Sequence, residues 1–542
     1  MVPPNTLLSP GETRILICDE LAPAALEIFA RRGFEPEVRT GLKGAELLDA
    51  VRKVHAIVVR SATKITREVI EAAEELRVIG RAGVGVDNVD TVAATERGVV
   101  VMNTPTGNTT TTGELAIALL LAISRNIAAG DRRVRSGSWN KKGLLGAELT
   151  GKRLGVIGLG RIGRVVAERA MGLKMEVVGH DPYLMRTGAG SPISGVDLLD
   201  LDSLLATSDF VTLHVPLLDS TRNLLSADRI ALMKPGARLI NAARGGLVDE
   251  AALAAALDDG RLAGAALDVL AEEPPSPEHP LLGRDDVIIT PHMGASSHEA
   301  QHNVAVGIAD QISDFLLEGV AHNSVNAPAV DSETLRAIAP YVILAEKMGS
   351  FLSQRTGGPV RKLEVTLGGE IASKDASYLS LSVLVGILNQ SELGVNRVNA
   401  PLIAKDRGIR VLTNTDGDSH SFQSLVKVRA STQGGEESHL VSGTVFGRAP
   451  RFVRVDDLHL DLAPEGTILI TTHSDRPGVM GRIGTILGDA KVNIRRVELG
   501  ASETGKPQFA SGFLSLDSEP PAEVMDAIRA VDGIEEVRLV RL

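Results

Sequence analysis

Three side chains suited to the oxidation of a secondary alcohol follow the last three apolar runs of a long αβ series. Arg244 comes after ARLINAA, Glu273 after AGAALDV and His292 after DVIITP. An imidazole has an ordinary pKa near neutrality and can take a hydroxyl proton. A carboxylate beside it orients the ring, and a guanidinium fork binds a substrate carboxylate and polarises the carbonyl that develops. We therefore predict that Arg244, Glu273 and His292 form a catalytic group.

Each of these residues also has a purely structural interpretation. His292 follows a proline in a loop, Glu273 lies in the acidic stretch AEEPP, and Arg244 precedes a glycine pair that suits a turn. Their shared position favours chemistry, because the carboxyl ends of neighbouring parallel strands open onto one crevice in which ligands bind.

A glycine-rich turn, GLGRIG, follows the apolar run RLGVI and opens the helical pattern RVVAERAMGL. In this context the glycines allow a tight turn, close approach of a pyrophosphate and close packing of helix on strand. The N-terminus of the helix offers free amides to the phosphates. We predict NAD as the cofactor, bound by Gly158, Gly160, Arg161, Ile162 and Gly163.

Asp181 ends the next strand, eighteen residues after Gly163. A carboxylate there binds the ribose hydroxyls and repels a 2′-phosphate, which favours NAD over NADP. The alternative is that Asp181 only begins an Asp-Pro turn. A second glycine turn, GVGVD at 83–87, lacks the third glycine, and we interpret it as an anion-binding turn and not as a second dinucleotide site.

The elements that must position these residues fall into several units. The chain of 542 residues exceeds what one hydrophobic core supports, so three or four domains are expected. Apolar runs alternate with helical patterns over the first hundred residues, a buried helix is expected over 110–125, and six parallel strands follow from residue 152. Beyond residue 328 the predicted strands and helices have an α+β pattern, and the last segment has the β-α-β-β-α-β order of a ferredoxin-like unit.

Bulk properties exclude several classes of protein. A net charge of −11 argues against a nucleic-acid or anionic-membrane partner. The single cysteine, Cys18, is expected to be a buried strand thiol in a reducing compartment. We find no segment of about 18 apolar residues and no signal peptide, and we expect a cytoplasmic protein, although a mature organellar form would look the same.

The motifs GLGRIG, NAARGGLVDEAAL, AGAALDVLAEEP and TPHMGAS resemble those of the D-isomer-specific 2-hydroxyacid dehydrogenases. RAGVGVDNVD, NTPTGNTTTTGELA and the C-terminal extension narrow the resemblance to the long members that oxidise 3-phosphoglycerate to 3-phosphohydroxypyruvate with NAD, the first step of serine biosynthesis. The resemblance covers Arg14 to Leu542. It implies a Rossmann-like doubly wound cofactor domain (108–292) inserted in a smaller flavodoxin-like α/β substrate domain (1–107 and 293–327), then an α+β intervening domain (328–463) and a ferredoxin-like ACT domain (464–542).

The resemblance also implies roles for individual residues. Arg244, Glu273 and His292 would be the catalytic residues, Asp268 would bind the nicotinamide carboxamide, and no metal is expected. Further cofactor contacts implied by motif are Val215, Ala242, Ala243, Gly294 and Ala295. Substrate contacts implied by motif are Arg60, Ser61, Gly83, Val84 and Asn108, with Arg81 and, across a dimer, Lys141 as further phosphate ligands.

The C-terminal half resembles regulatory modules. The segment that contains GTVFGRAPRFVRVDD is similar to an allosteric substrate-binding domain, although the usual Asp-Gly is Asp456-Asp457 here. In the ACT-like unit His473, Asp475 and Asn493 occupy the positions that would hold serine as an effector, and we expect both ends of this set to lie near one edge of the unit. The alternative for DRPG is a plain surface turn.

Two other functions are weighed against this prediction. A glyoxylate or hydroxypyruvate reductase of the same family would lack the C-terminal half. An NAD-sensing binding protein without turnover would not need all three catalytic side chains. The expected partners are therefore 3-phosphoglycerate, serine and further copies of the chain in a dimer or tetramer.

Overall fold

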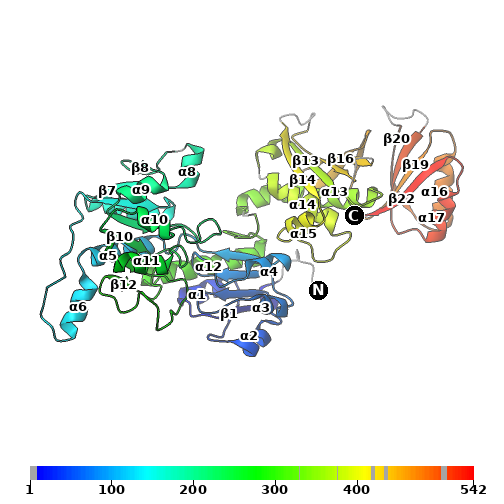
Figure 1. Cartoon of the computed structure of the whole chain (residues 1–542). Coiled ribbons are helices and arrows are strands. Elements are labelled where there is room, and N and C mark those ends of the chain that lie inside the picture. The colour runs from blue at the N-terminus through cyan, green and yellow to red at the C-terminus, as the bar shows by residue number, and fades with distance from the viewer. Residues whose placement is uncertain are drawn as a thin grey trace.

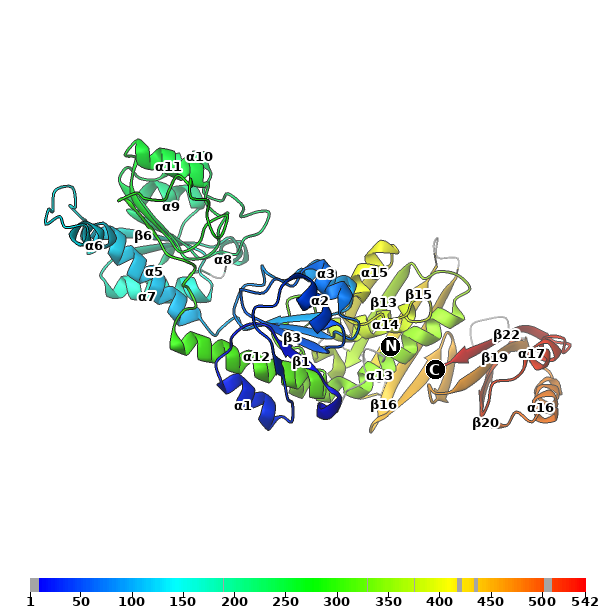
Figure 2. The same ribbon diagram turned by 90° about the horizontal axis from the view of Figure 1, so that it is seen from below.

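The computed structural model describes residues 9–188, 190–328, 330–374, 376–416, 422–432, 437–501 and 509–542. The molecule is elongated and contains four β-sheets, which we number in chain order (Figure 1). The second sheet lies at one end and the fourth at the other, with the first and third between them, as the view from below also shows (Figure 2).

The first sheet is parallel, in the order β2-β1-β3-β4-β5. This is the flavodoxin-like order that the sequence predicts. Its inner strands are apolar runs buried on both faces, because helices cover both sides. The exposed two-residue strand β2 carries too short a signal to be predicted. The elements are η1 (Pro10–Glu12), β1 (Ile15–Ile17), α1 (Ala24–Arg31), β2 (Glu37–Val38), α2 (Gly44–Val51), β3 (Ala56–Val59), α3 (Arg67–Ala72), β4 (Val78–Arg81), α4 (Thr91–Glu96) and β5 (Val100–Asn103).

The second sheet is also parallel, in the order β12-β11-β10-β9-β6-β7-β8. The direction of winding reverses between β6 and β9, which confirms the doubly wound Rossmann-like prediction. The short edge strand β8 adds a seventh strand to the six predicted ones. The elements are β6 (Arg153–Ile157), α7 (Arg161–Gly172), β7 (Glu176–His180), α8 (Pro182–Thr187), β8 (Asp197–Leu198), α9 (Leu201–Thr207), β9 (Phe210–Leu213), α10 (Ala227–Leu232), β10 (Ala237–Asn241), α11 (Glu250–Asp258), β11 (Leu262–Leu267) and β12 (Val287–Ile289).

Two long helices connect these units, α5 (Thr109–Ser124) and α12 (His298–Glu318). Helix α5 begins one residue before the predicted range and packs with the second sheet, followed by α6 (Ile127–Arg135). Helix α12 returns to the core of the first sheet. The second sheet is therefore an insertion in the first unit. Among the described residues no single helix is long and apolar enough to cross a membrane, and α5 and α6 qualify only together, by length and composition, as a pair bent by 65°.

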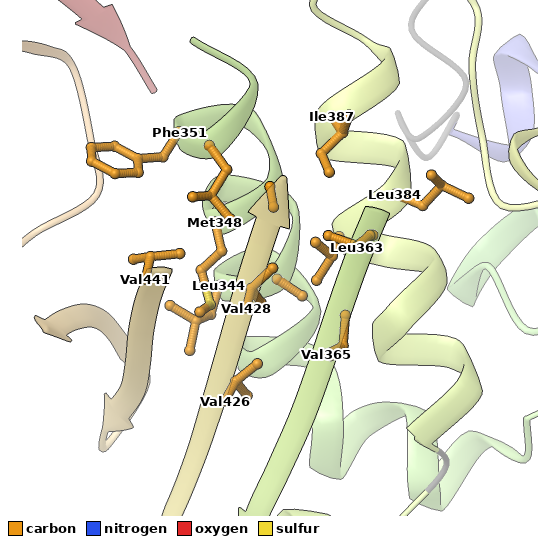
Figure 3. Close-up of a cluster of buried hydrophobic side chains, with 14 of the residues drawn as sticks. Leu344, Met348, Phe351, Leu363, Val365, Leu384, Ile387, Val426, Val428 and Val441 are labelled. Atoms are coloured by element: carbon orange, nitrogen blue, oxygen red, sulfur yellow. The ribbon is translucent and has the colours of Figure 1, made fainter. Parts of the chain in front are cut away.

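The third sheet is mixed, in the order β14-β13-β15-β16-β17-β18, with only β13 and β14 parallel. Side chains of two helices pack on the inner strands, and Figure 3 shows this apolar core around Met348, Leu384 and Val428. The elements are α13 (Ser332–Arg355), β13 (Lys362–Gly369), η2 (Glu370–Ser373), α14 (Ala376–Leu388), α15 (Ala400–Asp406), β14 (Arg410–Asp416), β15 (Ser424–Ser431), β16 (Ser438–Phe446), β17 (Ala449–Val455) and β18 (Leu458–Leu462).

The fourth sheet is antiparallel between neighbours, in the ferredoxin-like order β20-β21-β19-β22, as predicted. Its two helices cover one face. The other face places Ile468, Ile470, Phe513 and Val540 in the core of the third sheet, so these two units share one apolar core. The elements are β19 (Thr467–Ser474), α16 (Val479–Asp489), β20 (Ile494–Ala501), β21 (Phe509–Leu516), α17 (Ala522–Arg529) and β22 (Ile534–Arg541).

Candidate active site

The predicted catalytic histidine and glutamate form a pair. His292, just beyond β12, has its Nδ1 atom 2.8 Å from Oε2 of Glu273, which follows β11. Oε1 of the same carboxylate accepts the amide of Leu270 at 3.1 Å. The histidine side chain is 47% exposed, and its Nε2 atom has no hydrogen-bond partner among the described residues. With Nδ1 donating to the carboxylate, Nε2 is free to accept a proton.

Asp268 fixes the turn that carries this histidine. Its Oδ1 atom accepts the hydroxyl of Thr290 at 2.6 Å and the amide of Met293 at 2.7 Å, and Oδ2 accepts the amide of Gly294 at 2.8 Å. The carbonyl of Asp268 accepts the amide of His292, which has the uncommon φ of 50°. Burial raises the pKa of Asp268. The predicted contact of Asp268 with a carboxamide stays a prediction, but its role in the turn is a finding.

Arg244 reaches from the second sheet to the first. It follows β10, and its Nε atom lies 3.1 Å from Oδ2 of Asp87 in the second glycine turn. A Cβ atom on Gly85 would come within 2.0 Å of the guanidinium, so a side chain there would push Arg244 away from its present position. The sequence did not single out Asp87, because only the packing of one sheet beside the other brings it to Arg244.

Three arginines gather at this boundary. Arg81 ends β4, is largely buried, and has an Nε atom without a hydrogen-bond partner in the described part of the chain. Burial, together with the positive charges of Arg244 and Arg60, lowers the pKa of Arg81 to about 10. The carboxylates of Asp87 and Asp19 act in the opposite direction and balance part of the positive charge. The cluster stays net positive and therefore suits a small anion.

The second glycine turn presents its backbone to the same region. The carbonyls of Gly83 and Val84 accept the Thr104 amide and the Asn103 side chain. Their own amides have no acceptor among the described residues. Successive amides without an acceptor are available to an anion, and anion binding by this turn stays a prediction.

The remaining predicted substrate residues differ in their surroundings. The Oδ1 atom of Asn108, just before α5, is buried and has no hydrogen-bond partner within the described ranges, and Ser61 is exposed after β3. Lys141 is exposed on the loop after α6, which projects away from the first sheet (Figures 1 and 2). The contact of Lys141 with a substrate phosphate across a dimer stays a prediction.

The glycine-rich turn has the geometry that a dinucleotide needs. Gly158 has φ 94°, and a Cβ atom there would lie 2.5 Å from the carbonyl of His214 and 2.8 Å from Val215. A Cβ atom on Gly163 would lie 1.9 Å from the carbonyl of Gly158, while one on Gly160 would meet nothing within 4 Å. The residues thus fit NAD: the turn is tight, helix α7 packs closely, and space remains in front of its N-terminus, where Arg161 is exposed and Ile162 half-buried.

Asp181 begins the Asp-Pro turn, and its contact with ribose hydroxyls stays a prediction. Its Oδ1 atom accepts the amides of Tyr183 and Leu184 and so caps α8, and Oδ2 accepts the amide of Leu159 at 3.1 Å. The carboxylate thereby ties the glycine-rich turn to the end of β7. Two carboxylate oxygens offer about four acceptor sites, so capacity for a hydroxyl remains.

The other predicted cofactor residues surround the same strand ends. Val215 follows β9, Ala242 and Ala243 follow β10, and Gly294 and Ala295 follow the turn of His292. The hydroxyl of Thr112 in α5 donates to the carbonyl of Gly294 at 2.7 Å and holds this segment in place.

The predicted effector residues are not brought together within one chain. His473 is buried near the end of β19, where burial lowers its pKa, and Asp475 follows the strand. Asn493 precedes β20, and the first residues of β19 and β20 pair with the same residue of β21, which lies between these strands. Because β19 and β20 run parallel, Asn493 lies at the opposite end of the sheet, about 20 Å away along the strands. The expectation of one shared edge is wrong, because it ignored strand direction.

Three family models match the chain. They are the D-isomer specific 2-hydroxyacid dehydrogenase NAD binding domain over residues 117–294, the D-3-phosphoglycerate dehydrogenase intervening domain over 337–456, and the ACT domain over 467–533. They match parts of the second, third and fourth sheets in turn.

Relatives match almost the whole chain. It is 41% identical to the D-3-phosphoglycerate dehydrogenase of Archaeoglobus fulgidus over 98% of this chain and 100% of that protein. The D-3-phosphoglycerate dehydrogenase of Methanocaldococcus jannaschii is also 41% identical, over 98% and 100%. The solved TT0316 protein of Thermus thermophilus is 39% identical, with a TM-score of 0.53, over 58% of this chain and 100% of its own. The chain belongs to the D-3-phosphoglycerate dehydrogenase family of D-isomer specific 2-hydroxyacid dehydrogenases.

Proposed function

We propose that this chain oxidises 3-phosphoglycerate to 3-phosphohydroxypyruvate with NAD as the hydride acceptor. The observation that carries the proposal is that Arg244, which gathers with Arg60 and Arg81, precedes a glycine packed directly against the loop of Glu273, the carboxylate that binds His292. The substrate has a carboxylate and a phosphate, and the phosphate alone carries a charge of about −1.5 to −2 at neutral pH. Three guanidinium groups, partly balanced by Asp87 and Asp19, can contact both anionic groups.

The side chains divide the reaction between them. Nε2 of His292 takes the proton of the 2-hydroxyl, and Glu273 stabilises the imidazolium that results. Arg244 binds the carboxylate and polarises the developing carbonyl. NAD supplies a hydride acceptor when bound, and the GLGRIG turn, Asp181 and the backbone after β9 and β10 would hold it.

We further propose that the chain acts as a homo-oligomer. The arm formed by α6 and the loop after it exposes several large apolar side chains, with Trp139 92% and Leu145 94% exposed. Exposed apolar groups that lie close together mark protein interaction surfaces. Pairing through this arm would carry Lys141 toward the substrate cluster of a second copy.

Serine is proposed as an effector that binds between two copies of the fourth unit. Asn493 of one copy would have to meet His473 and Asp475 of another, since strand direction separates them in one chain. An isolated fragment from Pro464 onward would expose the face that carries Ile470, so serine binding is best measured on the full chain.

Steady-state kinetics on the full chain test the proposal. NADH formation is followed with 3-phosphoglycerate, D-glycerate and D-lactate, and NADH consumption with glyoxylate and hydroxypyruvate. The reduction assay also includes 3-phosphohydroxypyruvate. The proposal requires that 3-phosphoglycerate has the highest kcat/KM among the hydroxy acids and 3-phosphohydroxypyruvate the highest among the keto acids. A preference for glyoxylate or hydroxypyruvate would favour a reductase, and absence of turnover with all of them would favour an NAD-binding sensor.

A further inference from the structure

A second histidine–carboxylate pair lies behind the catalytic one. Glu250 is the first residue of α11, and its Oε2 atom lies 2.8 Å from Nε2 of His279. The two side chains are only 14% and 13% exposed. Nδ1 of His279 accepts the amide of Leu281 at 3.4 Å, so Nε2 is the nitrogen that donates to the carboxylate.

The other oxygen of Glu250 holds the loop that carries the catalytic glutamate. Oε1 accepts the amide of Ala271 at 2.7 Å. The preceding amide, of Leu270, is accepted by Glu273 itself. Two successive amides of the β11–β12 loop are thus fixed by two carboxylates, and one of these carboxylates also binds the imidazole of His292.

The same loop contacts the segment of the catalytic arginine. A Cβ atom on Gly245 would lie 1.9 Å from the carbonyl of Leu270, so the residue after Arg244 lies directly against the loop. A shift of the loop by a fraction of an ångström would therefore disturb both Glu273 and Arg244. Hydrogen bonds to charged groups are strong enough to define such a position, and a misplacement of about 1 Å can cost about 100-fold in rate.

We propose that Glu250 and His279 are positioning residues for the oxidation: they fix the 270–273 backbone so that Glu273 holds the imidazole of His292 ready for proton transfer. The inference rests on the proposed function for the identity of the substrate. It predicts that loss of the Glu250 carboxylate lowers kcat and leaves binding of the cofactor intact, because neither residue is part of the glycine-rich turn.

The test uses the full chain with Glu250→Gln and, as a matched control, Glu272→Gln. Glu272 is an exposed acid in the same loop and has no contact with the amide of Ala271. We expect kcat of Glu250→Gln to fall by about 10-fold or more, with NADH affinity and thermal midpoint close to those of the wild type. The loss should appear in kcat more than in the KM for the 2-hydroxy acid, because the inference places the defect in proton transfer and not in substrate binding. The control should match the wild type.

A second pair of variants separates positioning from folding. His279→Ala removes the donor to Glu250, and His279→Gln retains an amide donor, so we expect a lower kcat in the first and partial rescue in the second. A folded Glu250→Gln or His279→Ala protein with wild-type kcat would overturn the inference. The variant-to-wild-type ratio is measured on whichever 2-hydroxy acid the wild type oxidises best, so preference for another substrate contradicts the proposed function only.

Discussion

The two halves of the chain are joined in different ways. In the N-terminal half each sheet has its own core, and the two units meet through α5, α12 and a few polar contacts such as that of Arg244 with Asp87. In the C-terminal half the third and fourth sheets share one apolar core. Separate cores allow a cleft to open and close around a ligand, whereas a shared core moves as one body.

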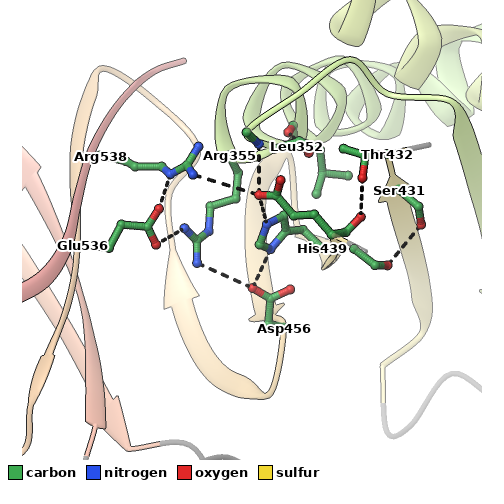
Figure 4. Close-up of polar contacts among 12 residues, drawn as sticks. Leu352, Arg355, Ser431, Thr432, His439, Asp456, Glu536 and Arg538 are labelled. Carbon is green, nitrogen blue, oxygen red and sulfur yellow. Dashed lines mark hydrogen bonds and ion pairs between the residues drawn. The ribbon is translucent and has the colours of Figure 1, made fainter. Parts of the chain in front are cut away.

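A polar network adds to the shared core (Figure 4). Arg355 of α13 lies 2.9 Å from Glu536 of β22 and 4.0 Å from Asp456, in the β17–β18 turn. His439 of β16 lies between Asp456, at 3.2 Å, and Glu437, at 3.1 Å. Its hydrogen bond with Asp456 raises the pKa of His439. The network thus joins the third and fourth sheets around a titratable group.

The largest expected effect in the N-terminal half follows from His292→Ala. We expect kcat to fall by about 100-fold or more, because the hydroxyl proton loses its acceptor. NADH affinity, measured by fluorescence titration, should stay close to that of the wild type. His302→Ala, an exposed histidine on α12, is the control and should be fully active. Near-wild-type kcat in His292→Ala would remove this residue from the mechanism.

Arg81→Met tests whether the buried arginine belongs to the substrate cluster. Loss of a charge-assisted hydrogen bond should lower kcat/KM for 3-phosphoglycerate by about 10- to 100-fold. D-glycerate, which lacks the phosphate, should be affected less. Equal losses would assign Arg81 to the carboxylate, and no loss with either substrate would contradict its place in the site.

Asp181→Ala should narrow the preference for NAD over NADP, because the carboxylate that repels a 2′-phosphate is lost. The same change removes the cap of α8, so Asp181→Asn is compared with it: an amide oxygen can still cap the helix but carries no charge. Kd values for NADH and NADPH are the measurement. A wild type that already prefers NADPH would show the ribose assignment to be wrong.

Sequence reasoning succeeded where local signals and strand topology agree. The glycine-rich turn and the closeness of Glu273 and His292 could be predicted because carboxyl ends of parallel strands share one edge, while the catalytic roles stay predictions. The strands β2 and β8 were missed because two residues show no periodicity. The ion pair of Asp87 with Arg244 depends on how two sheets pack, and Asn493 was misplaced because strand direction decides which end of a sheet a residue occupies.

The smallest expected effect concerns His439. Because its pKa is raised in the folded chain, its contribution to stability is fully present below pH 6.5, its ordinary value, and is lost as pH rises through the raised value. His439→Gln should therefore lower the thermal midpoint at pH 6 and match the wild type at pH 9, a difference on the order of 1 kcal/mol in unfolding free energy. A pH-independent difference would contradict the assigned charge.

The central claim is that the N-terminal half performs the oxidation and the C-terminal half responds to an effector as one body. A chain that ends at Ala327 tests it. Such a truncation is reasonable because the whole TT0316 protein matches only 58% of this chain. We predict that the truncated chain oxidises 3-phosphoglycerate with a kcat within a few fold of the full chain and does not respond to serine, whereas the full chain does. A folded, NADH-binding truncated chain without turnover, or one that still responds to serine, would contradict the claim.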